Sequence, residues 1–119
     1  MHILLIDDDK KTCSMLSMFF SKYGYKVDTV HSGEDAILML KNTTINYSLI
    51  TIDLFMPGMC GIQTYKKIQE FLKVPCIMMT SESDDTQTII ALEAGFDDYV
   101  TKPINPLVLL SRRQTKFAT

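Results

Sequence analysis

Side chains that carry oxygen or positive charge follow four short apolar runs of this chain, each at the point where the run stops. Acids follow residues 2–6, a single acid follows 47–52, two hydroxyls follow 75–79 and a lysine follows 99–101. In order, these side chains are Asp7, Asp8, Asp9, Asp53, Thr80, Ser81 and Lys102. Carboxylates held close together repel one another, so a cluster of them favours a bound cation. Oxygen ligands without a thiolate or imidazole set nearby indicate Mg²⁺ or Mn²⁺ rather than zinc.

A pocket that combined such a cation with the lysine would be equipped to handle a phosphoryl group. The cation and Lys102 would neutralise the phosphoryl oxygens, and Asp53 could act as the nucleophile. Mg²⁺ suits this task because it binds through one or two carboxylates plus phosphate oxygens and keeps several waters. We therefore expect the chemistry of this chain to centre on Asp53.

The elements that position these residues are indicated by hydrophobic patterns that alternate along the chain. Strands are expected where short runs are apolar or β-branched, because a strand buried on both faces of a parallel sheet lacks apolar–polar alternation. Helices are expected where apolar residues recur at i, i+3 and i+4. The expected strands are 2–6, 25–30, 47–52, 75–79 and 99–101, and the expected helices lie within 13–23, 32–40, 62–72 and 84–94, with a last helix from Leu107.

Five successive strand–helix units predict a parallel sheet with helices on both faces. Right-handed crossovers leave few topologies for such a sheet. In open α/β sheets, ligands bind beyond the carboxyl ends of the strands. Because all four polar groups follow strand ends, we expect them to meet at one edge of the sheet.

Length and composition exclude several other classes of protein. With 119 residues, 46% of them hydrophobic and 22% charged, the chain makes one globular domain. Its net charge of -2 argues against a nucleic-acid-binding surface. Three cysteines without a CxxC pair favour neither a disulfide framework nor a zinc site. With no signal peptide or membrane span in the sequence, we expect a cytoplasmic protein with no membrane partner.

Four segments of the sequence resemble the receiver domains of bacterial response regulators of two-component systems. They are ILLIDDD, ITIDLFMPGMCGI, IMMTSES and AGFDDYVTKP, and each lies at the end of an expected strand. The resemblance covers essentially the whole chain, so residues 1–119 are interpreted as one receiver domain. It implies an α/β, flavodoxin-like (βα)5 three-layer sandwich whose parallel strands have the order 2-1-3-4-5.

The resemblance also implies a metal site and a phospho-acceptor. Asp7 and Asp8 match the acidic pair that positions Mg²⁺, and Asp53 matches the aspartate that accepts the phosphoryl group. The backbone carbonyl of Phe55 matches a further metal ligand. The phosphoryl group would come from a sensor histidine kinase. The domain itself would be no enzyme beyond its own phosphorylation from a phosphodonor and its autodephosphorylation.

Further positions match residues that respond to phosphorylation in the family. Thr80 matches a hydroxyl that hydrogen-bonds the phosphoryl group, and Lys102 matches the lysine that pairs with it. Tyr99 matches an aromatic switch residue that turns inward when Thr80 moves. The bond between Lys102 and Pro103 matches a peptide bond that is cis in the family.

The C-terminal part of the chain resembles the branch whose full proteins carry a winged-helix DNA-binding domain. This implies regulation of transcription by a C-terminal output domain that is absent from this chain, with DNA reached only through that domain. Dimers in that branch imply a homodimer through helix 84–94, strand 99–101 and the helix from Leu107. The charged positions of that interface are matched by Asp97, Asp98 and Arg112.

Three other functions stay open at this stage. A phosphatase or phosphotransferase of the aspartate-nucleophile class typically carries a second Asp two positions later, whereas Asp53 is followed by Leu54 and Phe55. A flavin-binding module would need a hydroxyl- and glycine-rich loop after the first strand, where the acids would repel phosphate. The main alternative is a receiver-like interaction module that works without phosphorylation. His2 and His31 are interpreted as incidental, because neither has a partner at ligand spacing.

Overall fold

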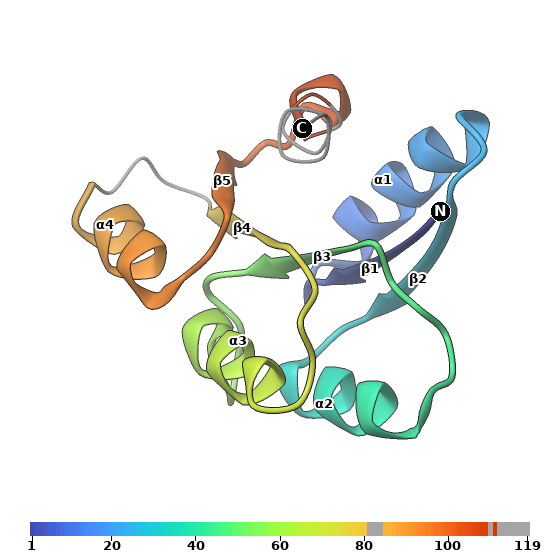
Figure 1. The fold of residues 1–119 in the computed structure, drawn as a ribbon. Coiled ribbons are helices and arrows are strands. Elements are labelled where there is room, and N and C mark those ends of the chain that lie inside the picture. Colours follow the sequence, from blue (N-terminus) through green and yellow to red (C-terminus); the bar gives the residue numbers. More distant parts are fainter. Residues whose placement is uncertain (81–84, 110, 112–119) are drawn as a thin grey trace.

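Residues 1–80, 85–109 and 111 are described by the computed structural model, and they form a central sheet of five strands flanked by helices (Figure 1). The strands are β1 (His2–Ile6), β2 (Lys26–Val30), β3 (Leu49–Asp53), β4 (Cys76–Thr80) and β5 (Asp98–Thr101). The helices are α1 (Lys10–Lys22), α2 (Gly33–Asn42), α3 (Gly61–Gln69) and α4 (Asp85–Ala94), and residues 106–109 begin a further helix. Within the described ranges, no helix combines the length and the apolar character that crossing a bilayer requires.

The five strands are parallel and lie in the order β2-β1-β3-β4-β5, which confirms the predicted topology. The chain passes from β1 outward to β2, returns past β1 to β3, and continues to β4 and β5. The winding direction therefore reverses between β1 and β3. In α/β sheets, the crevice beyond the carboxyl ends of two such strands is where ligands bind.

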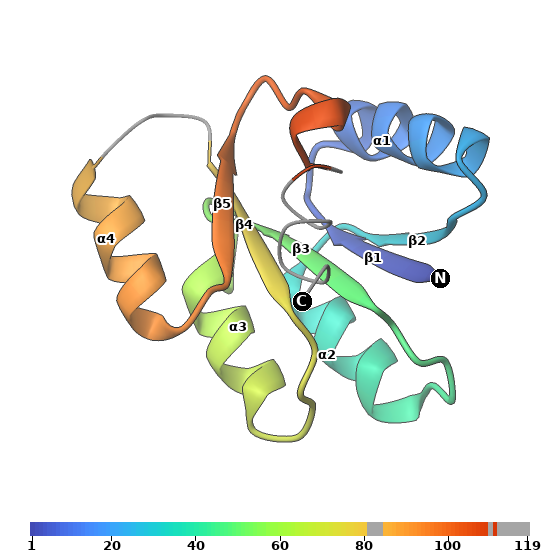
Figure 2. The ribbon, with the colours of Figure 1, turned by 45° about the horizontal axis from the view of Figure 1, so that its top comes forward.

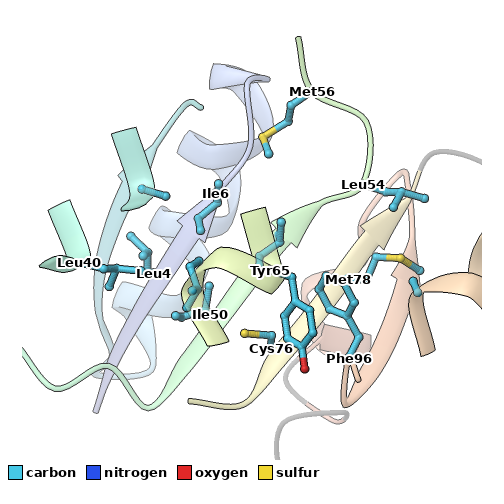
Figure 3. Close-up of a cluster of buried hydrophobic side chains, with 14 of the residues drawn as sticks. Leu4, Ile6, Leu40, Ile50, Leu54, Met56, Tyr65, Cys76, Met78 and Phe96 are labelled. Carbon is cyan, nitrogen blue, oxygen red and sulfur yellow. The ribbon is translucent and has the colours of Figure 1, made fainter. Parts of the chain in front are cut away.

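Helices cover both faces of the sheet, as predicted, and each face has its own buried core (Figure 2). On one face, the strands pack against α2, α3 and α4, and Tyr65 of α3 stacks on Phe96 with ring centroids 4.2 Å apart (Figure 3). On the other face, they pack against Leu16 and Phe20 of α1 and against Leu109. Burying one such side chain contributes about 1.5–3 kcal/mol. The two cores together hold the strands, and hence their carboxyl ends, in fixed positions.

The connection between β1 and α1 is short and closed by a helix cap. Asp9 is the N-cap of α1, and its carboxylate accepts hydrogen bonds from the backbone N–H of Lys11 at 3.0 Å and of Thr12 at 3.4 Å. The Thr12 hydroxyl donates to the same carboxylate at 2.8 Å. An N-cap of this kind typically stabilises a helix by about 1 kcal/mol. Here it also fixes the residues that follow β1.

Some element boundaries differ from the prediction. The third strand begins at Leu49 rather than Tyr47, because its pairing with β1 starts at Leu49, opposite Ile3. Tyr47 precedes the strand, and its hydroxyl donates to Asp28 Oδ2 at 2.6 Å. The last helix starts at position 106, directly before the apolar run from Leu107, and Asn105 Oδ1 accepts a 2.9 Å hydrogen bond from Leu107 N, as an N-cap does. Three residues named in the predictions lie outside the described residues: Ser81, Asp84 and Arg112.

Candidate functional site

The carboxyl ends of β1 and β3 place two aspartates side by side, away from solvent. Ile6 of β1 is paired with Ile52 of β3, so the next residues, Asp7 and Asp53, lie at the same level of the sheet. Their exposed fractions are 0% and 4%. Asp8 adds a third carboxylate from an exposed position, and one oxygen of each acid lies within 4.8 Å of the others. The structure thus brings together the three carboxylates that are expected to bind a metal.

An ammonium group reaches the same carboxylates from the end of β5. Lys102 Nζ lies 2.9 Å from Asp7 Oδ2 and 3.3 Å from Asp53 Oδ2. The backbone N–H of Lys102 donates to the Thr80 carbonyl at 2.6 Å, which ties β5 to the end of β4. The peptide bond between Lys102 and Pro103 is cis. Strand ends far apart in the sequence therefore meet at one edge of the sheet.

The positive charge at this edge does not balance the negative charge. Burial and the charge of Asp7 raise the pKa of Asp53 to about 7, and the ammonium of Lys102 offsets only part of this effect. Burial acts to lower the pKa of Lys102, but its contacts with Asp7 and Asp53 outweigh burial and raise that pKa, so the side chain stays charged. One ammonium thus faces two buried carboxylates and a third exposed one. The site favours a further cation.

One buried oxygen at the site also lacks a hydrogen bond. Lys102 Nζ forms an ion pair with Asp7 Oδ2 at 2.9 Å, and no other described residue donates to this oxygen. Asp7 Oδ1, in contrast, accepts a hydrogen bond from Asp9 N at 2.9 Å. A divalent cation would give this oxygen a second positively charged neighbour beside the ammonium of Lys102. Hard oxygen donors without a thiolate fit Mg²⁺ or Mn²⁺.

The other expected site residues lie on β4, on β5 and in the loop after β3. Thr80, the last residue of β4, is 1% exposed. Tyr99 of β5 is half-buried, is paired with Met78, and packs against the core under α2, α3 and α4. Paired residues of a parallel sheet, and residues two apart on a strand, point to the same face, so Thr80 and Tyr99 share a face. Phe55 follows Asp53 by two residues, and its side chain is exposed.

Gly61, which the sequence did not single out, packs against the backbone of Asp53. It is the first residue of α3, and a Cβ at this position would overlap the carbonyl oxygen of Asp53 and lie 2.8 Å from Leu54 Cα. The Gly61 N–H donates to the Leu54 carbonyl at 2.9 Å. The loop of residues 54–60 therefore closes directly against the backbone of Asp53. A side chain at 61 would have to push this loop away.

His31 is a second residue that the sequence did not point to. Its Nδ1 lies 3.1 Å from the backbone carbonyl oxygen of Asp7, 24 residues away in sequence. The contact follows from the pairing of β2 with β1, which brings the residues after the two strands together. His2 also has a partner, because its Nε2 lies 2.8 Å from Asp28 Oδ2. Both histidines, interpreted from the sequence as incidental, therefore contact other residues of the fold.

Known proteins share both this fold and this sequence pattern. A family model described as the response regulator receiver domain matches residues 3–114. The uncharacterized transcriptional regulatory protein YclJ of Bacillus subtilis is 40% identical over 112 residues, which cover 94% of this chain and 48% of that protein. A two-component response regulator from Clostridium difficile has a TM-score of 0.89 at 31% identity, over 96% of this chain and 93% of that chain. DrrB of Thermotoga maritima, described as an OmpR/PhoB homolog, has a TM-score of 0.83 at 32% identity, over 98% of this chain and 52% of that chain.

These matches concern only part of the related proteins. The chain spans about half the length of the curated relatives it matches, which are named as transcriptional regulatory proteins. The matched residues 3–114 include the aspartates that follow β1, Asp53 and Thr80 at the ends of β3 and β4, and Lys102 after β5. The strand order and the helices on both faces agree with receiver structures. The chain belongs to the family of response regulator receiver domains of two-component systems.

Proposed function

We propose that this receiver domain accepts a phosphoryl group on Asp53 from a sensor histidine kinase, with the help of Mg²⁺ or Mn²⁺. One observation carries the proposal: the buried Asp53 carboxylate lies beside a second buried carboxylate, Asp7, and 3.3 Å from the ammonium of Lys102. Phosphoryl transfer needs a positioned nucleophile and positive charge around the transferred group. Asp7 also contacts the ammonium, so the choice of Asp53 as the nucleophile rests on its match to the phospho-acceptor position of receiver domains.

The metal would be held by the carboxylates of Asp7, Asp8 and Asp53 and by the backbone carbonyl of Phe55. When bound, Mg²⁺ would neutralise negative charge on the phosphoryl oxygens. Asp7 would be the inner ligand, since its buried Oδ2 accepts no hydrogen bond from the described residues. Asp8 would be the outer ligand, on the exposed turn into α1. With a cation beside it, Asp53 would be ionised more fully than its raised pKa otherwise allows near neutral pH.

Asp53 would attack the phosphorus atom of a phosphohistidine on the kinase. A P–O bond forms to the carboxylate while the P–N bond breaks, and its electron pair passes to the histidine ring, which takes up a proton. Lys102 would pair with one phosphoryl oxygen, and the Thr80 hydroxyl would donate to another. Because residues 54 and 55 provide no second acid, the domain would not turn over external substrates. Hydrolysis of its own acyl phosphate would end the signal.

The phosphorylated state would act through the surface formed by α4, β5 and the helix that begins at 106. Movement of Thr80 toward the phosphoryl group would change the space available to Tyr99 on the same face of the sheet. The relatives are transcriptional regulators, so the output would be a DNA-binding domain beyond this chain. A homodimer would use the same surface. Asp97 would be held in place there, because its Oδ2 accepts a 2.8 Å hydrogen bond from Cys76 N.

Asp53→Asn tests the acceptor directly. The wild-type domain should incorporate labelled phosphoryl groups from acetyl phosphate or a phosphorylated kinase, whereas the Asn variant should incorporate none, because the amide is not a nucleophile for this step. Asp35→Asn, which removes an exposed carboxylate of α2, is the matched control and should be labelled like the wild type. Label on the Asp53→Asn protein would place the acceptor elsewhere.

Beryllofluoride, a mimic of the aspartyl phosphate, tests the switch without a kinase. Added with Mg²⁺, it should shift the amide resonances of Asp53, Thr80, Tyr99 and Lys102. The Asp8→Ala variant should need more Mg²⁺ for the same change, because it lacks the outer ligand. If Mg²⁺ binds but beryllofluoride changes nothing, the chain acts instead as an interaction module that does not need phosphorylation.

A further inference from the structure

The backbone between the two adjacent metal-binding acids is held by side chains from neighbouring elements. The peptide group that joins Asp7 to Asp8 includes the Asp7 carbonyl, and two donors converge on its oxygen. His31 Nδ1, from the turn after β2, lies at 3.1 Å, and Cys13 Sγ, from α1, lies at 3.5 Å. Rotation of this peptide group would break both contacts. Its orientation is therefore restrained by residues that do not themselves belong to the metal site.

His31 acts at the point where the pairing of β1 with β2 ends. Asp7 N donates to Val30 O at 3.1 Å, one step beyond the paired strand residues. In a continued parallel ladder, the next bond would run from the N–H of residue 32 to the Asp7 carbonyl. Ser32 instead begins α2 as its N-cap, and its hydroxyl accepts from Asp35 N at 3.1 Å. The imidazole of His31 supplies a donor to the Asp7 carbonyl at this point.

The acceptor determines which ring nitrogen carries the proton. A carbonyl oxygen can only accept, so Nδ1 of His31 must carry hydrogen, which is true of one neutral tautomer and of the charged ring alike. The restraint on Asp7 therefore does not require the ring to change its charge. The Cys13 thiol is a weaker second donor. Burial raises its pKa to about 11, so its proton stays in place at neutral pH.

Asp8 depends on this restraint more than Asp7 does. The Asp7 carboxylate is buried and is fixed by Asp9 N at 2.9 Å and by Lys102 Nζ at 2.9 Å. Asp8 is exposed, and within the described part of the chain no hydrogen bond or ion pair holds its carboxylate. The direction of the Asp8 side chain is thus set by its backbone. The peptide group that His31 contacts is the one that precedes Asp8.

We propose that His31 is a positioning residue for metal binding, which donates to the Asp7 carbonyl and thereby sets the direction in which Asp8 presents its carboxylate. The inference rests on the proposed function, because it concerns the metal of that same site. Removing groups that orient metal ligands typically weakens metal binding by about 10–100-fold. His31 acts on its ligand through one peptide group, so a loss near the lower limit, about tenfold, is expected.

Three single variants test this role. His31→Leu removes the donor but keeps a side chain branched at Cγ, and His31→Asn restores an N–H donor at the same number of bonds from the backbone as Nδ1. His2→Leu removes the other histidine, at the start of β1, and is the matched control. The Mg²⁺ dissociation constant is measured for each by titration followed in amide NMR spectra. Unfolding in urea with EDTA is measured in parallel, so that a loss of stability is seen separately from a loss of metal affinity.

The Mg²⁺ affinities expected for these variants distinguish a positioning role of His31 from a merely structural one. His31→Leu should bind Mg²⁺ about tenfold more weakly, whereas His31→Asn and His2→Leu should bind it like the wild type. Should the Leu variant not fold, His31→Ala removes the donor without placing a large apolar group beside the acids, and the same loss is expected. Equal affinity of the wild type and the donor-free variant would overturn the inference, as would an Asn variant that does not regain affinity. A wild-type domain that binds no Mg²⁺ would overturn the proposed function itself, so the two failures are distinguishable.

Discussion

The reactivity of the Asp53 carboxylate and its burial place opposite demands on its protonation state. To act as a nucleophile it must be ionised, but burial beside Asp7 raises its pKa to about 7. In an unfolded chain, an aspartate has a pKa of about 3.9. Between about pH 4 and pH 7, the folded domain therefore binds a proton at Asp53 that the unfolded chain has released. Without metal, the stability of the fold should fall as pH rises through this interval.

Asp53→Asn should remove this pH-dependent loss of stability. With EDTA present at about pH 8, the variant is expected to have a free energy of unfolding higher than that of the wild type by up to about 4 kcal/mol, because a neutral amide replaces a buried charge. At about pH 4 the difference should approach zero, because Asp53 is then protonated in the folded wild type. Urea unfolding at both pH values provides the measurement, with Glu93→Gln, an exposed residue of α4, as the control. If the free energy of unfolding of the variant exceeded that of the wild type by the same amount at both pH values, burial of the Asp53 charge would not be the cause of the increase.

Among the helices, α3 bears most directly on the acceptor, because its first residue packs on the backbone of Asp53. Gly61→Ala should destabilise the domain by about 1–3 kcal/mol, because the added methyl group meets backbone atoms that cannot rotate out of its way. Mg²⁺ affinity should fall as well, since the displaced loop carries the carbonyl of Phe55. Urea unfolding and Mg²⁺ titration of the same protein measure the two effects.

Gly24→Ala is the matched control for this element. Gly24 has a φ of 83°, and a Cβ there would meet nothing within 4 Å. Alanine at this position carries backbone strain of about 1 kcal/mol or more but lies in the turn between α1 and β2, so Mg²⁺ affinity should not change. If both glycine variants lost stability and neither lost Mg²⁺ affinity, the contact of Gly61 with the loop would have no bearing on the site.

The elements were largely predictable from the sequence, whereas their cross-strand contacts were not. Strands buried on both faces leave unbroken apolar runs, and parallel strands share one carboxyl edge, so the meeting of Asp53 with Lys102 followed from element order alone. The start of β3 was misplaced because Tyr47 fits the apolar pattern although its ring reaches toward β2. The contacts of His31 and Gly61 depend on strand register and loop path. Residue type and spacing do not encode either of these quantities.

Across the whole molecule, the site lies between a rigid centre and a more easily displaced edge. β1 and β3 have hydrogen-bonded neighbours on both sides, whereas β5 pairs with β4 and ends the described sheet. α4 lies beside this edge (Figures 1 and 2) and exposes apolar side chains: Ile89, Ile90 and Leu92. Moving an edge strand and its helix disturbs less buried surface than moving a central strand. β2 is the other edge strand, but Lys102, which directly follows β5, lies 3.3 Å from Asp53 Oδ2. A change at Asp53 should therefore spread toward β5 rather than toward β2.

Thr80→Ala tests whether this spread depends on the hydroxyl at the end of β4. In the wild type, Mg²⁺ and beryllofluoride should shift amide resonances both around Asp53 and along β5, because Thr80 and Tyr99 share one face of the sheet. In the Ala variant, the resonances around Asp53 should still shift, because the acceptor and the acids are intact, but those of Tyr99 and its neighbours should stay near their starting positions. Thr80→Ser keeps a hydroxyl and should restore them. A full response of β5 in the Ala variant would mean that the signal leaves the site by another route, and the contact between Lys102 and Asp53 would be the next to test.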